Sequence, residues 1–183
     1  MEAGLNTPLL ATGGVLAVLL FWAVGAYNRL VALRNAIGAA WTQIDEPLRR
    51  RRELLQQLIG LLREPLAAEH AALDAVLAAS EQAHAASLAV KPRPGEALAI
   101  ESLQLAEKVL AGALARLRAL LEQHPSEQPV LAECRAEIDA IEQKLVFRRQ
   151  LYNQAAHHYN DAVRQFPTSL LTPLFRFAPA GTL

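Results

Sequence analysis

The apolar residues of this chain form two different patterns, and the first lies at its N-terminal end. From Ala3 to Asn28 the sequence contains no charged residue. Its most apolar part, from Leu9 to Tyr27, would span roughly 28 Å as an α-helix that rises about 1.5 Å per residue. This length is close to the thickness of the hydrocarbon core of a bilayer. The pattern predicts a transmembrane helix over residues 9–28, preceded by a short tail over residues 1–8.

Two other interpretations of the apolar segment are a cleaved signal peptide and a buried helix of a soluble protein. Val24, Gly25 and Ala26 would be acceptable before a cleavage site. However, a signal peptide begins with a basic region, and the residues before this segment include Glu2 and no Lys or Arg. The segment is also long for a signal peptide. We therefore favour an uncleaved anchor.

The distribution of basic residues around the segment predicts its orientation. No Lys or Arg precedes it, whereas Arg29 and Arg34 follow it directly. Lys and Arg accumulate on the cytoplasmic side of membrane spans. We therefore expect a single span of the cytoplasmic (inner) membrane, with the short tail outside and the rest of the chain in the cytoplasm.

After the span, apolar residues recur every three or four positions, which is typical of amphipathic helices. The pattern is interrupted at Pro65, at residues 91–95, at residues 125–129 and at Pro167. Each of the four segments between these breaks has one apolar stripe, and such stripes can be buried against one another. We therefore predict an all-α fold, with the transmembrane helix followed by an elongated antiparallel four-helix bundle over residues 29–167.

The stripes also predict which residues form the core. The first segment should continue the membrane helix without a break. Its stripe comprises Leu30, Leu33, Ile37, Trp41, Ile44, Leu48, Leu55, Leu58 and Leu62. The stripe of the fourth segment comprises Leu131, Cys134, Ile138, Ile141, Leu145, Tyr152, Ala155, Tyr159 and Phe166. Cys134, the only cysteine, is therefore expected to be a buried structural thiol rather than a nucleophile.

Pro47 lies inside the first segment, although a proline removes one backbone hydrogen bond of a helix and clashes with the preceding turn. The apolar stripe nevertheless continues in phase from Ile44 through Leu48 to Leu55. We therefore expect a kink within one helix, and not a boundary between two domains.

A run of four arginines, residues 49–52, follows this proline closely. Successive residues of a helix are rotated by about 100°, so the four side chains cannot all face solvent on one side. Either Arg51 or Arg52 must turn toward the buried seam, where a carboxylate such as Asp45 or Glu142 can pair with it. The alternative is lipid binding, but the run begins about 33 Å beyond the span along a straight helix. We expect a structural or partner-facing role.

Composition and the spacing of reactive residues argue against several functions. Lys and Arg together number 18, as do Asp and Glu, so no net charge attracts nucleic acid. None of the five histidines lies four residues from another, so no helical metal site is indicated. The sequence has no recognisable nucleophile–base pair, phosphate-binding loop or dinucleotide motif. We therefore expect no enzymatic activity, no metal and no cofactor.

Two blocks of the sequence resemble the signature of the LemA family of bacterial membrane proteins. The first block reads YNRLVALRN over residues 27–35, AWTQID over residues 40–45 and LRRR over residues 48–51. The second block contains two Tyr-Asn pairs seven residues apart, followed by Phe-Pro. The residues that carry the resemblance are Tyr27, Asn28, Arg34, Asn35, Trp41, Asp45, Arg51, Tyr152, Asn153, Tyr159, Asn160, Phe166 and Pro167.

The resemblance implies a single-pass anchor with a cytoplasmic helical bundle and no established enzymatic activity. It covers both ends of the chain in the expected order. One departure is that the proline-containing apolar stretch usual after the basic run is absent. Gln56, Gln57 and Leu58 stand there instead.

The two Tyr-Asn pairs have two interpretations. Tyr152 and Tyr159 lie on the stripe of the fourth segment, so their rings should pack in the core with each hydroxyl pointing outward or to a buried partner. Asn153 and Asn160 lie one position further round, on the same edge of that helix. We expect them to form hydrogen bonds between helices that fix the register. A binding site is the alternative.

The C-terminal tail, residues 168–183, is apolar but too short to span a bilayer. In an antiparallel bundle the fourth helix returns toward the membrane, so the tail should emerge beside the headgroups. It can pack on the first helix near residues 27–33, bind a partner or lie at the membrane interface. As a binding segment, it could be deleted with little effect on the bundle's thermal transition. Its candidate partner-facing or lipid-facing residues are Leu170, Leu171, Leu174, Phe175 and Phe177.

These features together predict a membrane-anchored helical scaffold or adaptor that acts through contacts with a protein partner at the cytoplasmic face of a bacterial membrane. The alternative is a membrane-organising protein that self-assembles or contacts lipid through its C-terminal tail. Neither interpretation involves nucleic acid.

Overall fold

The computed structural model describes residues 3–123 and 128–183, the first eight of them (3–10) by their backbone alone, and this part of the chain is helical without any strand. The all-α class is confirmed. The helices are α1 (Ala3–Leu62), η1 (Ala67–Glu69), α2 (His70–Val90), α3 (Ala97–Gln123), α4 (Pro129–Arg164), η2 (Thr168–Leu170) and α5 (Thr172–Phe175).

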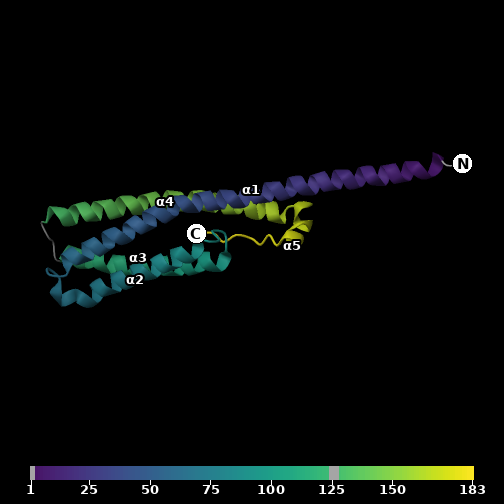
Figure 1. Cartoon of the computed structure of the whole chain (residues 1–183). Helices are drawn as coiled ribbons and strands as arrows, with labels where there is room; N and C mark the ends of the chain where they lie inside the picture. Colours follow the sequence, from purple (N-terminus) through teal and green to yellow (C-terminus); the bar gives the residue numbers. More distant parts are fainter. Residues whose placement is uncertain (1–2, 124–127) are drawn as a thin grey trace.

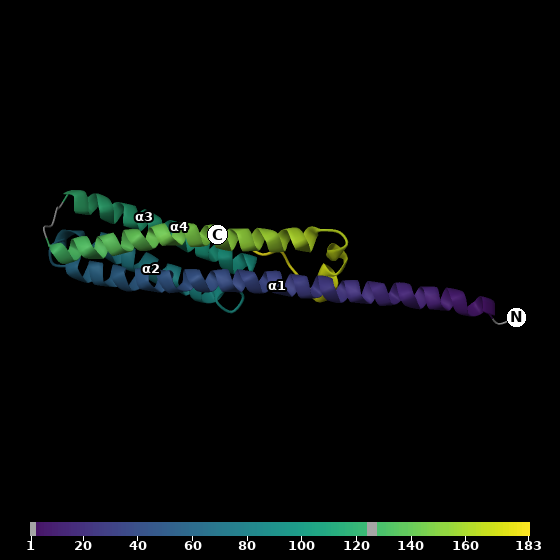
Figure 2. The same ribbon diagram turned by 90° about the horizontal axis from the view of Figure 1, so that it is seen from above.

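The long helices form two antiparallel pairs, α1 with α4 and α2 with α3, that lie side by side in an elongated domain (Figures 1 and 2). The C-terminal half of α1 packs on α4, α2 packs on α3, and α1 also packs on α2. The backbones of α3 and α4 approach each other far less closely. The expected helices are present, but the domain differs from an evenly packed four-helix bundle because it is open between α3 and α4.

The core follows the apolar stripes closely. Trp41 on α1 is 2% exposed, Tyr152 on α4 is fully buried, and Cys134 is buried as expected. The predicted stripe is wrong at Phe166, which is 75% exposed. The physical reason is that α4 ends at Arg164, so Phe166 no longer follows the helical periodicity.

Pro47 interrupts neither α1 nor its burial pattern, so the prediction of one helix through this position is confirmed. A residue at position 47 would normally donate its backbone N–H to the carbonyl of Gln43, four residues earlier, and proline has no N–H to donate. In the structure Arg148 of α4 donates a side-chain N–H to the Gln43 carbonyl instead. The hydrogen bond that proline removes is therefore replaced by a contact between α1 and α4.

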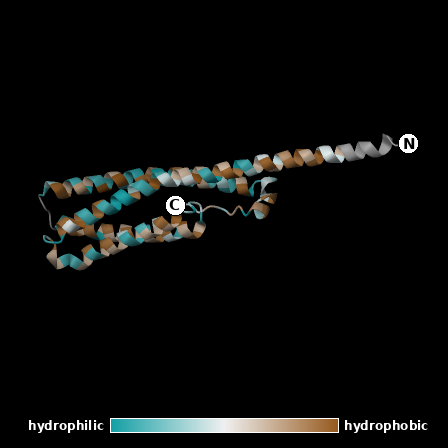
Figure 3. Cartoon of the chain, viewed as in Figure 1, coloured by the Kyte–Doolittle hydropathy of each residue, from teal (hydrophilic) through white to brown (hydrophobic). Residues whose placement is uncertain are grey.

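The N-terminal half of α1 extends beyond the domain as a single helix, and the part of this extension that Figure 3 colours by hydropathy is mostly apolar. Its large apolar side chains over residues 15–21, including Val18, Leu20 and Phe21, are more than half exposed. Within the described residues, α1 is the one helix whose length and composition suffice to cross a membrane. The extension enters the domain without a break at Leu30, which is fully buried.

The contact between Arg148 and Gln43 can be tested by a double-mutant cycle. Arg148→Ala leaves the Gln43 carbonyl without its partner and should lower the free energy of unfolding by about 1–3 kcal/mol. In a Pro47→Ala background the N–H of residue 47 can bond to that carbonyl, so Arg148→Ala should cost clearly less. Denaturant unfolding in detergent, followed by circular dichroism, measures both values. Equal costs in the two backgrounds would show that Arg148 acts in another way.

Candidate functional site

The opening between α3 and α4 is the place where polar side chains of the domain converge. A cavity of about 430 Å³ lies there, lined by residues of α1, α3 and α4 and by Leu183 at the end of the tail. Its charged lining residues are Arg51, Glu107, Lys108, Arg118, Glu142 and Arg149. This cavity and the tail beside it form the candidate site.

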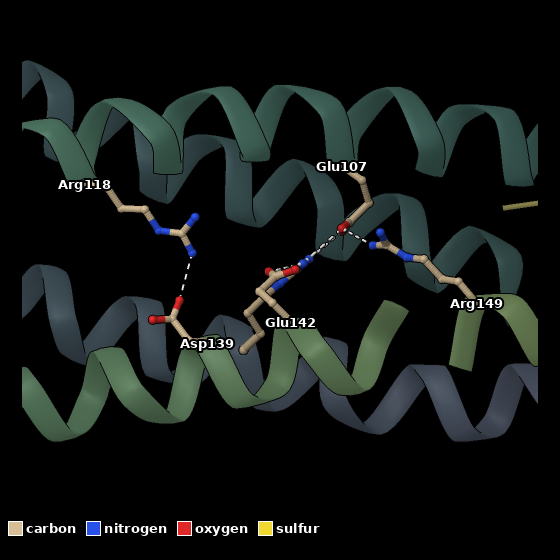
Figure 4. A network of polar contacts seen from close by, with 6 residues as sticks. Glu107, Arg118, Asp139, Glu142 and Arg149 are labelled. Atoms are coloured by element: carbon tan, nitrogen blue, oxygen red, sulfur yellow. Dashed lines mark hydrogen bonds and ion pairs between the residues drawn. The ribbon is translucent and has the colours of Figure 1, made fainter. Parts of the chain in front are cut away.

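The charged lining residues form a layer between α1, α3 and α4, and Arg51 lies at its centre although its side chain is only 4% exposed. Its guanidinium donates to both carboxylate oxygens of Glu107 on α3 and, over 2.8 Å, to Oε1 of Glu142 on α4. Arg149 of α4 donates to Glu107 over 2.7 Å, as Figure 4 shows. Burial alone would lower the pKa of Arg51, but the hydrogen bonds and charges of Glu107 and Glu142 outweigh burial and raise it.

The four consecutive arginines reach four different surroundings because the helix rotates each by about 100° from the last. Arg49 lies 3.7 Å from Asp45 on its own helix, and Arg50 donates to Glu137 on α4. Arg52 donates to Glu81 on α2, and both oxygens of that carboxylate accept. The run therefore ties α1 to all three other long helices. The predicted pairing of this run with Glu142 is present, whereas the pairing with Glu107 was not predicted.

The same geometry limits what the charged layer can do chemically. Each carboxylate at its centre is held by an arginine, so neither is placed as a free acid or base. In the described ranges, no group of three or more His, Cys, Asp or Glu side chains is arranged to hold a metal ion. The layer is suited to fixing helices against one another and to recognising charged groups that enter the cavity.

The tail enters the opening between α3 and α4 and is held there by the two asparagines of α4. Asn160 donates to the carbonyl of Ala180 over 2.9 Å and accepts the N–H of Ala180 over 2.7 Å. Asn153 forms the same two bonds with Leu183, both at 2.6 Å. The prediction that these asparagines bond to another helix is therefore wrong, because their partner is the backbone of the tail.

The spacing of the asparagines matches the tail that they bind. Seven residues of an α-helix advance by about 10.5 Å. The three residues from Ala180 to Leu183 span about 10 Å when they are extended. Asn153 and Asn160 can therefore hold the tail at two points at once. The tail runs antiparallel to α4, because its later residue binds the earlier asparagine.

Further contacts hold the tail against α3 and the connection between α2 and α3. The amide of Gln104 on α3 donates to the Thr182 carbonyl, and the N–H of Gly181 donates to the Gly95 carbonyl. A Cβ atom at Gly181 would lie 3.0 Å from both Ala97 and Ile100, so the approach requires glycine. The tail therefore fills the gap between α3 and α4 by close backbone contact.

The two tyrosines of α4 bind carbonyl groups beside this seat. The Tyr152 hydroxyl lies within hydrogen-bond distance of the Pro94 and Gly181 carbonyls, and the Tyr159 hydroxyl donates to Ala178 over 3.1 Å. Burial raises the pKa of both hydroxyls, so both stay protonated as donors at neutral pH. Core packing was expected for these rings, with each hydroxyl pointing outward or to a buried partner; both rings are buried, and both hydroxyls bind carbonyl groups.

The apolar candidates of the tail divide into two groups. Phe175 and Phe177 pack on Tyr27, with ring centroids 5.0 and 5.7 Å from its ring. The tail therefore packs on the first helix within residues 27–33, which was one of the three predicted alternatives. Phe177 is 8% exposed and is not available to a partner, which corrects its place among the binding candidates. Leu170 and Leu174 are 64% and 72% exposed. Leu171 is half-buried and so belongs to neither group.

The remaining family-motif residues lie around these contacts. Asp45 is buried and lies 3.7 Å from both Arg49 and Lys91. The two exposed residues Arg34 and Asn35 line a second cavity near the tail. A further group contributes no contact that positions the site. It comprises the exposed residues Asn28 and Phe166 and the half-buried Pro167.

The layer around Arg51 can be tested by removing its charge. Arg51→Met keeps the length of the side chain but leaves the half-buried Glu142 without a cation and Glu107 with Arg149 alone, so it should cost about 1.5–3 kcal/mol of unfolding free energy. The matched change Arg50→Met removes an exposed pair with Glu137, which solvent screens, and should cost clearly less. Denaturant unfolding of both variants measures the difference. Similar losses would show that Arg51 is not a special position.

The clamp on the tail is tested by Asn153→Asp and Asn160→Asp. A carboxylate can accept the backbone N–H but cannot donate to the carbonyl and repels it, so each change should cost about 1–3 kcal/mol. Gln154→Glu, which alters an exposed residue of α4 in the same way, should cost little. Deleting residues 177–183 should lower the thermal transition and abolish the effect of either aspartate.

This expectation replaces the one drawn from the sequence, in which the tail could be lost with little effect. The structure contradicts that view because residues 177–183 contribute Phe177 to the core and bond to Asn153, Asn160 and Gln104. An unchanged transition after the deletion would show that the tail is not part of the fold.

Comparison with known proteins identifies the family to which the chain belongs. The LemA family profile matches residues 40–183, a range that contains the arginine run, both asparagines of the clamp and the tail that they hold. No curated protein shows significant similarity to the chain. Because the match covers well over half of its 183 residues and agrees with the two sequence blocks, the chain belongs to the LemA family.

Proposed function

We propose that this protein is a membrane-anchored helical scaffold or adaptor that acts through protein contacts at the cytoplasmic face of a bacterial inner membrane. The observation that carries the proposal is the continuity of α1, whose exposed apolar half and buried half belong to one 60-residue helix. A helix without a break fixes the height and direction of the domain relative to whatever surrounds its N-terminal half.

The exposed half of α1 supports the membrane part of the proposal. Its six large apolar side chains over residues 15–21 are all more than half exposed. Burying a side chain of this size is worth about 1.5–3 kcal/mol, so exposure of all six to water would forgo on the order of 10 kcal/mol. A bilayer would cover them. Arg29 and Arg34 at the inner end of the segment favour a cytoplasmic domain.

The outer face of α3 supports the protein-contact part of the proposal. Leu98, Leu105 and Val109 are exposed there, and their spacing of seven and four residues places them on one side of the helix. Aligned apolar residues on a surface are typical of interaction sites, unlike apolar residues scattered singly. Phe147 and Leu151, one turn apart on α4, form a second exposed pair.

We further propose that the protein acts without catalysis and without nucleic acid. Support comes from the neutral overall charge and from the carboxylates of the central cavity, which arginines already neutralise. The family assignment leaves this role open, so the proposal rests on the charges and contacts of this chain.

The second candidate function is membrane organisation by lipid contact or self-assembly through the tail. One observation favours it: Leu170 and Leu174 are exposed close to Phe175, which packs on Tyr27 at the end of the span. These two side chains would lie beside the headgroups, where a short apolar segment can insert.

The proposed role predicts position-dependent crosslinking in intact cells. A photoreactive residue at Leu105, on the apolar face of α3, should give an adduct of defined mass with a cytoplasmic protein. The same residue at Ala111, exposed on α3 but rotated by about 120° from Leu105, should give little. Protease added outside spheroplasts should leave residues 29–183 intact. Cleavage of the domain from outside, or no adduct at Leu105, would contradict the proposal. A crosslinked dimer of the chain would favour the second function.

A further inference from the structure

A second cavity, of about 570 Å³, lies at the end of the domain from which α1 extends. It is bounded by α1, by the connection between α2 and α3 with the first residues of α3, and by the tail after α5. Leu98 of the apolar face of α3 and Ala180 of the clamp border it, but its charged residues belong to neither feature. Its volume is that of a site for a small ligand or a lipid headgroup.

The charged residues that line this cavity are three arginines and one carboxylate, so its lining carries a net positive charge. Arg93 lies 3.3 Å from Glu96, which partly neutralises that pair. Arg34 and Arg176 form no ion pair with any residue that the structure describes. This contrasts with residues 49–52, each of which has a carboxylate partner. Two guanidinium groups therefore face the cavity with their charge uncompensated.

The backbone at Arg176 is held in an unusual conformation. Its φ angle is 54°, in the left-handed region, where a side chain with a Cβ is disfavoured by about 1–2 kcal/mol. The residues on both sides, Phe175 and Phe177, pack on Tyr27, and the N–H of Phe177 bonds to the Thr172 carbonyl. The turn is thereby fixed, and it presents a long cationic side chain to the cavity where glycine would be less strained.

The cavity lies at the level expected for lipid headgroups. Arg34 is seven residues beyond Tyr27, which corresponds to about 10.5 Å along α1. Arg176 follows Phe175, whose ring lies 5.0 Å from that of Tyr27. If the span ends at Tyr27, both guanidinium groups can reach the headgroup layer, which extends several ångströms beyond the hydrocarbon. This placement rests on the membrane insertion proposed above.

We propose that this cavity binds the phosphate group of an anionic phospholipid, with Arg34 and Arg176 as the main ligands and Arg93 as a third. The planar guanidinium donates two parallel N–H groups, which match two oxygens of a phosphate. A lipid phosphate would supply the negative charge that the cavity lacks. It would also tie the tail, which carries Arg176, to α1, which carries Arg34, at the membrane surface.

The test uses the full chain in nanodiscs made of equal parts phosphatidylcholine and phosphatidylglycerol. Native mass spectrometry of the released protein counts the lipids that stay bound. The wild type should retain phosphatidylglycerol in preference to phosphatidylcholine. The double variant Arg34→Gln with Arg176→Gln should lose this preference by about tenfold or more, because two charge-assisted contacts disappear. Arg34→Lys with Arg176→Lys keeps both charges and should retain part of it.

The matched control is Arg116→Gln with Arg135→Gln, which removes two exposed charges near the end of α3 and the start of α4, far from this cavity. It should keep the preference for phosphatidylglycerol. An equal loss in this control, or no preference in the wild type, would overturn the proposal. The insertion on which it rests is judged separately by resistance of the protein to alkaline extraction from membranes. A protein that inserts but shows no preference for the anionic lipid refutes this site alone.

A second arm distinguishes a lipid phosphate from a soluble one. The wild type in lipid-free detergent is titrated with glycerol 3-phosphate, which has the phosphate but no acyl chains. Weak binding, in the millimolar range or above, is expected because the acyl chains and the membrane surface contribute to retention. Tight binding that is lost in the Arg34 and Arg176 double variant would assign the cavity to a soluble phosphate compound and overturn the lipid assignment.

Discussion

The helical domain depends on a match between the pitch of α4 and the length of an extended chain. Because seven helical residues and three extended residues cover nearly the same distance, Asn153 and Asn160 bind Ala180 and Leu183 through two pairs of hydrogen bonds. Each pair satisfies a backbone N–H and a backbone carbonyl that enter the gap between two helices. The tail can therefore occupy this gap, and it separates the first residues of α3, from Ala97 to Gln104, from the second half of α4.

In the rest of the opening between α3 and α4, buried polar groups also need hydrogen-bond partners. Arg51, which is 4% exposed, reaches across it to Glu107 and Glu142. At a more exposed contact between α1 and α4, Arg148 binds the Gln43 carbonyl that Pro47 leaves without its usual donor. Removing charges from water is costly, so these contacts contribute little net stability. Their effect is on register, because a shift of α1 against α4 by one turn would leave several of these groups without partners.

The apolar pattern of the sequence was sufficient to predict the helices, their boundaries within a few residues and most of the core, including Trp41 and Tyr152. The charge pattern predicted that Arg51 or Arg52 would turn toward the core and pair with a carboxylate such as Asp45 or Glu142; Arg51 does so, with Glu142. Periodicity could not predict the seat of the tail. Residues 178–183 follow no helical repeat, and a side-chain amide that binds a backbone leaves no mark on the sequence that it binds. The heptad spacing of the two asparagines was visible, but it fits a partner helix equally well.

The central claim of this account is that residues 177–183 belong to the fold and are held there by the amides of α4. Hydrogen exchange at the backbone N–H groups of Ala180 and Leu183, measured by NMR on the full chain in detergent, tests it most directly. The account predicts exchange much slower than in an isolated peptide of the same sequence, and faster exchange at Ala180 after Asn160→Asp. Exchange at both positions as fast as in the free peptide would contradict it.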